Sequence, residues 1–334
     1  MTTIHKATGA GDFLTAVPAM LGYRPSESVV AVPFAGTRTI GAMRFDVPAA
    51  ENAGSFAAVA MGLLVKVENA TGFALIVYGE REQAEAIGSA MTTQADMCGM
   101  QVIDRLYVAG DAWGRIGEDG TEALPETPAH LAAMLTASDQ RAGAALPAVD
   151  EALAAQVAEA LPTDLPVALA MAGGDLLDAI EQALSWDGSD LDAGAVALLS
   201  AMLNRPATRD IALVQWSHGF AAGESALDAQ IGWEQGEEYP AHLARVMWGE
   251  GPRPDAKRLD AALTACRYVA ALSPEDAPVG PLAAAAWLSW ALGRSTHADA
   301  YARRALAIDS EHGLSQIVRT FVDAGHLPEF AFSR

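Results

Sequence analysis

The hydrophobic pattern of the chain changes its period well before the midpoint. Up to about residue 116, short runs of β-branched and apolar residues alternate with amphipathic segments, whereas the remainder is rich in Ala and Leu at helical spacing. Between the two patterns, residues 117–128 are rich in Gly, Glu, Asp, Thr and Pro. We therefore predict two domains, an α/β sandwich over residues 1–125 and a helical domain over residues 126–334.

The first pattern predicts a helix, two strands, a helix, a strand, a helix and two more strands. The runs at 28–34 and 39–47 are separated by a turn and predict a hairpin. The predicted helices lie at residues 12–22, 55–68 and 80–97, and the other predicted strands at 72–78, 102–108 and 112–116. This order gives a mixed sheet flanked by helices.

The second pattern predicts a mostly α-helical domain, punctuated by Pro and by paired Gly. Near its end, the segments at 282–292 and 297–308 predict a helical hairpin. The second helix of a tetratricopeptide repeat has a spacing of apolar residues similar to that of Ala298, Ala302, Ala305 and Leu306, although Ser310 stands where such repeats favour Pro. Only one such unit is visible, and a solenoid needs about three, so an ordinary helical hairpin is the alternative.

Charge and composition exclude several classes of function. The 334 residues include 21 Lys and Arg against 42 Asp and Glu, which gives a formal net charge of −21. Such a chain repels phosphate backbones and has no basic patch to offset this, so we expect no nucleic-acid partner. Its apolar stretches are shorter than the about 20 residues that span a bilayer, and no signal-peptide core follows the first residues. We expect a cytoplasmic protein with no membrane partner.

Motifs for metal, cofactor or triad chemistry are missing from the sequence. Cys98 and Cys266 lie far apart and predict two buried, reduced thiols. The seven His residues are scattered without an HExxH pattern, and no GxSxG elbow occurs. Glu234, Glu237 and Glu238 could pair for acid/base catalysis, but a solvated acidic turn is the simpler interpretation. We predict no metal and no cofactor, and enzymatic activity stays open.

One loop gathers groups that can recognise an anion. Between the first predicted helix and strand, Arg24, Ser26 and Ser28 place a guanidinium and two hydroxyls near a strand end, where binding residues often lie. Arg44 and Asp46 alternate on one face of the next strand and could border the same edge. These five residues form the candidate ligand-binding site. The alternative is structural, with Arg24 in an ion pair with Glu27 or Asp46 and Ser26 capping a turn.

The opening segment carries a distinctive pattern. Residues 13–30 form an apolar helix that ends in Leu-Gly-Tyr-Arg-Pro-Ser-Glu-Ser and leads into an apolar strand, and Arg-Phe-Asp follows at 44–46. These features resemble the family called domain of unknown function 4192, found in actinobacterial chromosomes and their bacteriophages. Looser similarities follow at Arg-Asp 209–210, in the helix around Trp287 and at residues 325–328.

The resemblance implies the two-part architecture but no established activity. Many members of the family continue from a Trp-containing strand into a Pro-rich segment with Cys. Here Trp113 is present, but no Cys follows it in that stretch. Chemistry that depends on those cysteines is therefore not expected.

The main functional hypothesis is a non-enzymatic module for protein binding or self-assembly. The helical domain would contact a protein partner or another copy in a homo-oligomer, with the α/β domain as a rigid platform. Trp216, Trp233, Trp248 and Trp290 are candidate anchors, because Trp is enriched at interface hot spots; burial in a helical core is their alternative. The rival hypothesis is a binding protein or enzyme for a small anionic ligand, with its site at the loop that carries Arg24.

Overall fold

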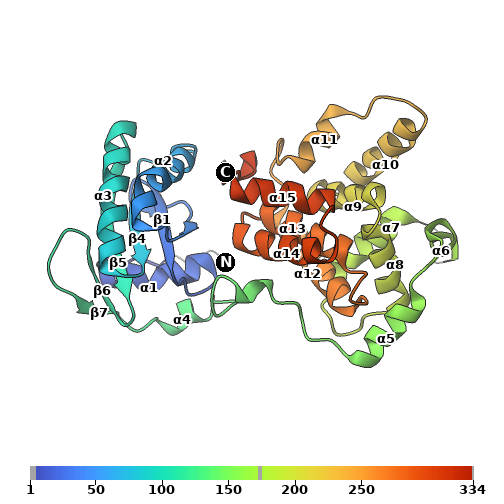
Figure 1. Cartoon of the computed structure of the whole chain (residues 1–334), viewed down its shortest axis with the longest axis horizontal. Coiled ribbons are helices and arrows are strands. Elements are labelled where there is room, and N and C mark those ends of the chain that lie inside the picture. The colour runs from blue at the N-terminus through green and yellow to red at the C-terminus, as the bar shows by residue number, and fades with distance from the viewer. Residues whose placement is uncertain (1–4, 172–174, 333–334) are drawn as a thin grey trace. The chain divides into compact units, whose positions relative to one another are not determined.

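The computed structural model describes residues 5–171 and 175–332. The chain forms two compact units, of which the first ends at Gly143 and the second spans Ala144–Phe332 (Figure 1). This division lies further along the chain than the expected boundary at residue 125. The short helix α4 (Ala129–Ala132) and the turn after it remain with the first unit, where the backbone N–H of Thr136 donates to the carbonyl of Gly22 at 2.7 Å.

The first unit is built on one mixed sheet. Its strands are β1 (Ser28–Ala35), β2 (Arg38–Thr39), β3 (Met43–Asp46), β4 (Gly72–Tyr78), β5 (Gln101–Ala109), β6 (Ala112–Arg115) and β7 (Glu122–Ala123). Their order is β2-β1-β4-β5-β6-β7, with β3 pairing with β1 beside β2. Among the described strands, β4 and β5 are the one parallel pair. The α/β prediction is confirmed, and β7 is a short strand that the sequence did not predict.

The predicted strand at 39–47 forms the two short strands β2 and β3 because of Pro33 in β1. The carbonyl of Pro33 accepts the N–H of Ile40 at 2.9 Å, so this residue faces β2 and β3. Proline has no N–H, so it cannot donate the second hydrogen bond that an antiparallel pair would form here. The hydrogen-bond ladder on this side of β1 is therefore interrupted at Pro33, and it begins again where Ala31 pairs with Met43.

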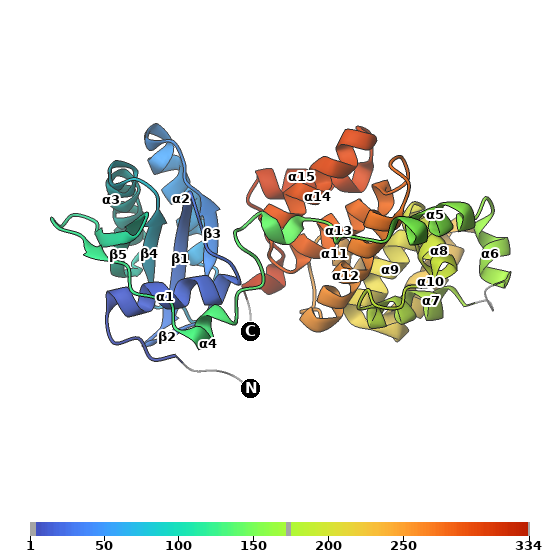
Figure 2. The ribbon, with the colours of Figure 1, turned by 90° about the horizontal axis from the view of Figure 1, so that it is seen from below.

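Helices cover both faces of the sheet, as predicted. They are α1 (Ala10–Leu21), α2 (Ala53–Leu64) and α3 (Arg81–Cys98). Figure 2 shows α1 crossing one face and α2 and α3 packed on the other. Successive side chains of β4 alternate between the two cores: Ile76 lies with Val17 of α1, whereas Leu75 lies with Met61 and Ile87. Every residue of β4 is buried, as expected for a central strand covered on both sides.

The second unit is helical, as predicted. Its helices are α5 (Glu151–Ala160), α6 (Leu165–Met171), α7 (Leu176–Gln182), α8 (Ala193–Leu203), α9 (Pro206–His218), α10 (Phe220–Glu234), α11 (Ala241–Met247), α12 (Ala256–Leu272), α13 (Val279–Ala291), α14 (Ser295–Ile308) and α15 (Gly313–Asp323). Asp150, Asp175, Asp192 and Asp255 cap α5, α7, α8 and α12, with each carboxylate accepting a backbone N–H of the first turn. The apolar helix α13 is buried from Gly280 to its last residue, Ala291.

The predicted helical hairpin consists of α13 and α14, which pack along each other. Its small residues Ala298, Ala302 and Ala305 are fully buried, so they allow a close approach of the two helices. The likeness to a tetratricopeptide repeat stays a prediction.

The two cysteines differ in their surroundings. Cys266 is buried in the helical core, where burial raises the pKa of its thiol. Cys98 is exposed, contrary to prediction, because residues 96–99 at the end of α3 are all exposed. Among the described helices, none combines the length and the hydropathy that crossing a bilayer requires.

Candidate functional site

Four of the five predicted site residues form one hydrogen-bonded network at the start of β1. The hydroxyl of Ser28 donates to the carbonyl of Ser26 at 2.7 Å and accepts from Nε of Arg44 at 2.7 Å. Nη2 of Arg44 lies 2.7 Å from Oδ1 of Asp46. The antiparallel register of β1 and β3 produces this arrangement, since it sets Ser28 opposite Asp46 on one face of the sheet.

Gln140 closes the network from the end of the first unit. Its Oε1 accepts from the backbone N–H and the hydroxyl of Ser26 at 3.2 and 3.4 Å, and its Nε2 donates to the carbonyl of Ser26 at 2.9 Å. The side chain therefore fixes the loop that precedes β1. Sequence reasoning missed Gln140 because it lies 114 positions from its partner, beyond any local motif.

Arg24 stands apart from this network. Its side chain is exposed, and within the described part of the chain its guanidinium has no ion-pair partner. The alternative interpretation, an ion pair of Arg24 with Glu27 or Asp46, is not found among the described residues, and Asp46 is bound to Arg44 instead. The loop thus presents a free guanidinium on a backbone held by Gln140.

The electrostatics of the network favour a structural role for Arg44. Its side chain is 7% exposed, whereas that of Asp46 is 81% exposed, so the ion pair neutralises a buried cation from the solvent side. Burial raises the pKa of the nearby Tyr23 hydroxyl, Arg44 lowers it and Asp46 raises it. Among the described residues of the network, no nucleophile lies beside a base and no two carboxylates face each other.

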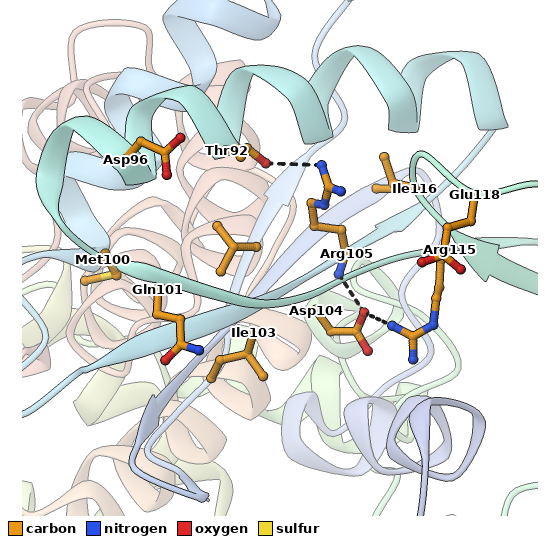
Figure 3. Close-up of a pocket in the computed structure, with 11 residues that line it drawn as sticks. Thr92, Asp96, Met100, Gln101, Ile103, Asp104, Arg105, Arg115, Ile116 and Glu118 are labelled. Atoms are coloured by element: carbon orange, nitrogen blue, oxygen red, sulfur yellow. Dashed lines mark hydrogen bonds and ion pairs between the residues drawn. The ribbon is translucent and has the colours of Figure 1, made fainter.

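A cavity of about 500 Å³ lies between the end of α3, the first half of β5 and the segment after β6 (Figure 3). Asp104 accepts the backbone N–H of Arg105 at 2.9 Å and forms an ion pair with Arg115. Nη1 of Arg105 donates to the hydroxyl of Thr92 at 3.4 Å. β6 pairs with β5 only from Leu106 onward, so the Asp104 carboxylate caps the strand edge where the ladder stops. These contacts occupy the part of the β5 edge that has no partner strand. They place no nucleophile beside a base in the cavity.

The four candidate Trp anchors fall into two groups. Trp216 and Trp290 are fully buried, and their Nε1 atoms donate to the carbonyls of Ile180 at 2.9 Å and His326 at 2.8 Å. They are core residues, as the alternative interpretation predicts. Trp233 and Trp248 are 57% and 50% exposed. Trp248 packs edge-to-face on Phe321, with ring centroids 5.4 Å apart.

The outward face of α10 combines apolar and acidic side chains. Phe220 and Ile231 are 36% and 45% exposed, and the exposed Glu224 and Asp228 lie between them. These four residues, hereafter the α10 stripe, fall within one quadrant of the helix at 100° per residue. Trp233 lies on the opposite side of α10, at its last turn. Figure 1 shows α10 beside α9 at the margin of the second unit.

An acidic turn follows α10. Glu234, Glu237 and Glu238 are all exposed, as a solvated turn requires. From Phe220 to Glu238 the chain has five carboxylates, and no Lys or Arg occurs between Arg209 and Arg245. The stripe therefore lies in a locally anionic stretch of an already acidic chain.

The Arg-Asp pair at 209–210 belongs to a half-buried cluster on α9. Nη2 of Arg209 lies 2.9 Å from Oδ1 of Asp210, and Nη1 lies 3.4 Å from Nε2 of His312. Burial and the charge of Arg209 lower the pKa of His312, and Asp309 partly offsets this. His312 also caps α15, because its Nδ1 lies 3.4 Å from the N–H of Ser315. The cluster thus ties α9 to the start of α15.

Comparison with known proteins places the chain in a family. No curated protein and no solved structure matches it. One family profile does match, and the match spans both units, from the first turn of α1 to the segment after α15. With residues 11–329 covered, the chain belongs to the family described as Domain of unknown function (DUF4192).

Proposed function

We propose that this protein is an interaction module and that its α10 stripe binds a basic, amphipathic helix of a partner protein. The observation that carries the proposal is the exposure of Phe220 and Ile231 at the two ends of a carboxylate-lined helix face. Large apolar side chains on an outward helix face favour a helix-in-groove or helix-on-helix contact. The surrounding carboxylates select a cationic partner.

The spacing of the stripe defines the partner further. Phe220 and Ile231 are eleven residues apart, about three helical turns or roughly 16 Å. A partner helix that follows α10 would place two apolar residues at the same spacing, with Lys or Arg opposite Glu224 and Asp228. A second copy of this chain is a poorer occupant, because two surfaces of net charge −21 repel each other.

A labelled peptide tests the charge part of this proposal. The probe is a synthetic amphipathic helix with two Leu eleven residues apart and four Lys between them, and its binding is followed by fluorescence anisotropy. The double variant Glu224→Gln/Asp228→Asn should weaken binding about fivefold to thirtyfold, because exposed charge pairs contribute about 0.5–1 kcal/mol each.

The matched control removes two exposed carboxylates from the first unit, in Glu122→Gln/Glu126→Gln. This control has the same net charge as the Glu224→Gln/Asp228→Asn variant. It should nevertheless bind the peptide as tightly as the unaltered protein does. Equal weakening in both double variants would show that only the overall charge attracts the peptide, which contradicts a site on α10. A peptide with Glu in place of Lys should not bind.

Anion recognition at the Arg24 loop is the second candidate function. It is favoured by one observation, the free guanidinium of Arg24 on a loop that Gln140 holds in place. Arg24→Ala should abolish binding of inorganic phosphate or citrate while the melting temperature stays unchanged, because the exposed guanidinium forms no ion pair within the described chain. Arg38→Ala, at another exposed arginine of the first unit, is the control. A loss of stability without a loss of ligand would contradict this candidate.

We further propose that α13 and α14 resemble a tetratricopeptide unit. The fully buried Ala298, Ala302 and Ala305 support this, because small residues at such positions let paired helices approach closely. Ala302→Leu should then destabilise the second unit by about 1–3 kcal/mol through overpacking. Urea unfolding measures this change, and an unaltered free energy of unfolding would contradict the close approach.

A further inference from the structure

Several buried hydrogen-bond donors of the second unit lack an acceptor among the described residues, among them one on α12 and one on α14. The hydroxyl of Tyr301 on α14 and Nε of Arg267 on α12 are both buried, and neither has a hydrogen-bond partner among the described residues. Tyr301 as a whole is fully buried. A buried donor without an acceptor costs about 1–3 kcal/mol, so such groups call for a specific explanation.

The helix arrangement places these two donors at corresponding positions of α12 and α14. α12, α13 and α14 are consecutive neighbours joined by short loops, so α12 and α14 run parallel with α13 packed against both (Figure 1). Nη1 of Arg294, which precedes α14, lies 2.7 Å from Oδ1 of Asp260 on α12. Arg267 follows Asp260 by seven residues, and Tyr301 follows Arg294 by seven. Each is therefore two turns further along the same side of its helix, in the same direction.

Positive charge gathers at this point. Burial raises the pKa of Tyr301, and the charges of Arg267, Arg304 and Arg294 oppose that rise, so three guanidiniums act on one hydroxyl. Arg304 lies three residues after Tyr301 and shares its side of α14.

The three guanidiniums have different partners within the protein. Arg294 is paired with Asp260, and an Nη of Arg267 donates to the carbonyl of Ala145. Arg304 is exposed and has no ion pair within the described chain. In a protein of net charge −21, three arginines thus act on one buried hydroxyl, and one of them, Arg294, is paired with a carboxylate. Within residues 5–171 and 175–332, neither Arg267 nor Arg304 forms an ion pair with a carboxylate.

We propose that Tyr301, Arg267 and Arg304 form a binding site for an oxyanion, a phosphate or a carboxylate group, between α12 and α14. An oxyanion offers several acceptor lone pairs in one small group, so it can accept from the Tyr301 hydroxyl and from Nε of Arg267 together. The charge of Arg304 then closes the site from the solvent side. This site is independent of the α10 stripe and of the Arg24 loop.

Calorimetric titration of the full-length protein with inorganic phosphate, and separately with acetate, tests the proposal in a chloride buffer of low ionic strength. Binding of phosphate alone or of acetate alone would identify the group that the site takes. Tyr301→Phe and Arg304→Gln should each weaken binding at least fivefold, because charge-assisted hydrogen bonds to an anion are strong. Absence of binding by both anions would overturn the proposal.

Two neighbouring residues supply matched controls. Tyr268→Phe removes a hydroxyl on α12 that donates to the carbonyl of Asp187, and Arg303→Gln removes the arginine next to Arg304, which pairs with Asp299. Both variants should bind the anion within twofold of the unaltered protein. Binding that is equally weak in the controls, or unchanged in Tyr301→Phe, would contradict the site.

Stability separates a binding defect from a folding defect. Without added anion, Tyr301→Phe should unfold at the same urea concentration as the unaltered protein or a higher one, because the lost hydroxyl makes no hydrogen bond within the described chain. Phosphate should then raise the melting temperature of the unaltered protein more than that of the variant. Equal increases would count against a role for Tyr301.

Discussion

Arg44 and Arg209 show how this protein places guanidiniums in its interior. Their side chains are 7% and 8% exposed, and each binds a carboxylate close in sequence, Asp46 or Asp210, that is itself more exposed. A buried cation needs such a partner, since removing one member of a buried pair costs about 3–5 kcal/mol. Arg209 additionally lies against His312, so the charge state of that histidine affects the α9–α15 contact.

His312 should make stability depend on pH. Its pKa in the folded protein is lowered from the ordinary 6.5, so the unfolded chain binds the proton more readily. The contribution of His312 to stability is therefore fully present above pH 6.5 and declines as pH falls toward the folded-state pKa. Urea unfolding at a series of pH values between about 7.5 and 5 measures this decline.

Comparison with His312→Gln isolates the effect from that of other titrating groups. The variant should lose less stability than the unaltered protein over the same pH range. His242→Gln, at an exposed position of α11, should follow the unaltered protein. If His312→Gln loses as much stability as the unaltered protein when the pH falls, the lowered pKa of His312 is not the source of the pH dependence.

Among the elements, α8 and α13 are in close contact at Gly280. A Cβ atom at this position would lie 2.2 Å from the carbonyl oxygen of Leu203, which is backbone and cannot swing aside. The N–H of Gly280 also donates to Oδ1 of Asn204 at 2.8 Å. The start of α13 is therefore fixed on the end of α8 by shape and by hydrogen bonding.

Gly280→Ala should destabilise the protein by about 1–3 kcal/mol, because one helix must move away from the other. Gly62→Ala is the control, since Gly62 lies within α2 with open space around it. That substitution should stabilise by about 0.5–1 kcal/mol through the higher helix propensity of Ala. Chemical unfolding of both variants measures the difference, and a Gly280→Ala protein of unchanged stability would contradict the close packing.

Local sequence patterns predict most elements of the fold, because those elements depend on nearby residues. The strand β4 follows from its continuous apolar run, and the end of α1 follows from Gly22, which adopts φ 83° as the helix cap. Contacts between distant residues could not be predicted in this way. The bonds of Gln140 to Ser26 and the approach of Gly280 to Leu203 depend on how whole elements pack.

The candidate site was only partly predictable for the same reason. Ser28, Arg44 and Asp46 are brought together by a hairpin, which the alternation in sequence indicates. Arg24 lies on the same loop but points to solvent, and no sequence pattern separates it from the residues of the network. Trp216 and Trp233 likewise have similar surroundings in sequence and opposite exposure in the fold.

At the scale of the molecule, the two units have separate hydrophobic cores. The core of the second unit draws its buried residues only from position 144 onward, whereas the cores beside the sheet draw theirs from the first unit. Six of the seven Trp residues follow Gly143, so Trp fluorescence reports mainly on the second unit. Far-UV circular dichroism reports on the helices of both.

These two probes should therefore give different urea unfolding curves, as expected for units that unfold independently. Trp113→Phe removes the Trp of the first unit and should leave the fluorescence transition in place. Coincident transitions by both probes would show that the two units unfold as one cooperative body.

The most direct test of the proposed function is calorimetry of the Lys-rich amphipathic peptide with the Phe220→Ala/Ile231→Ala variant. The unaltered protein should bind one peptide, and the variant should bind at least tenfold more weakly, because each apolar side chain contributes about 1 kcal/mol or more when covered. Trp233→Phe, on the opposite side of α10, should retain full affinity. Equal affinity of the unaltered protein and the double variant would show that the α10 stripe is not the binding surface.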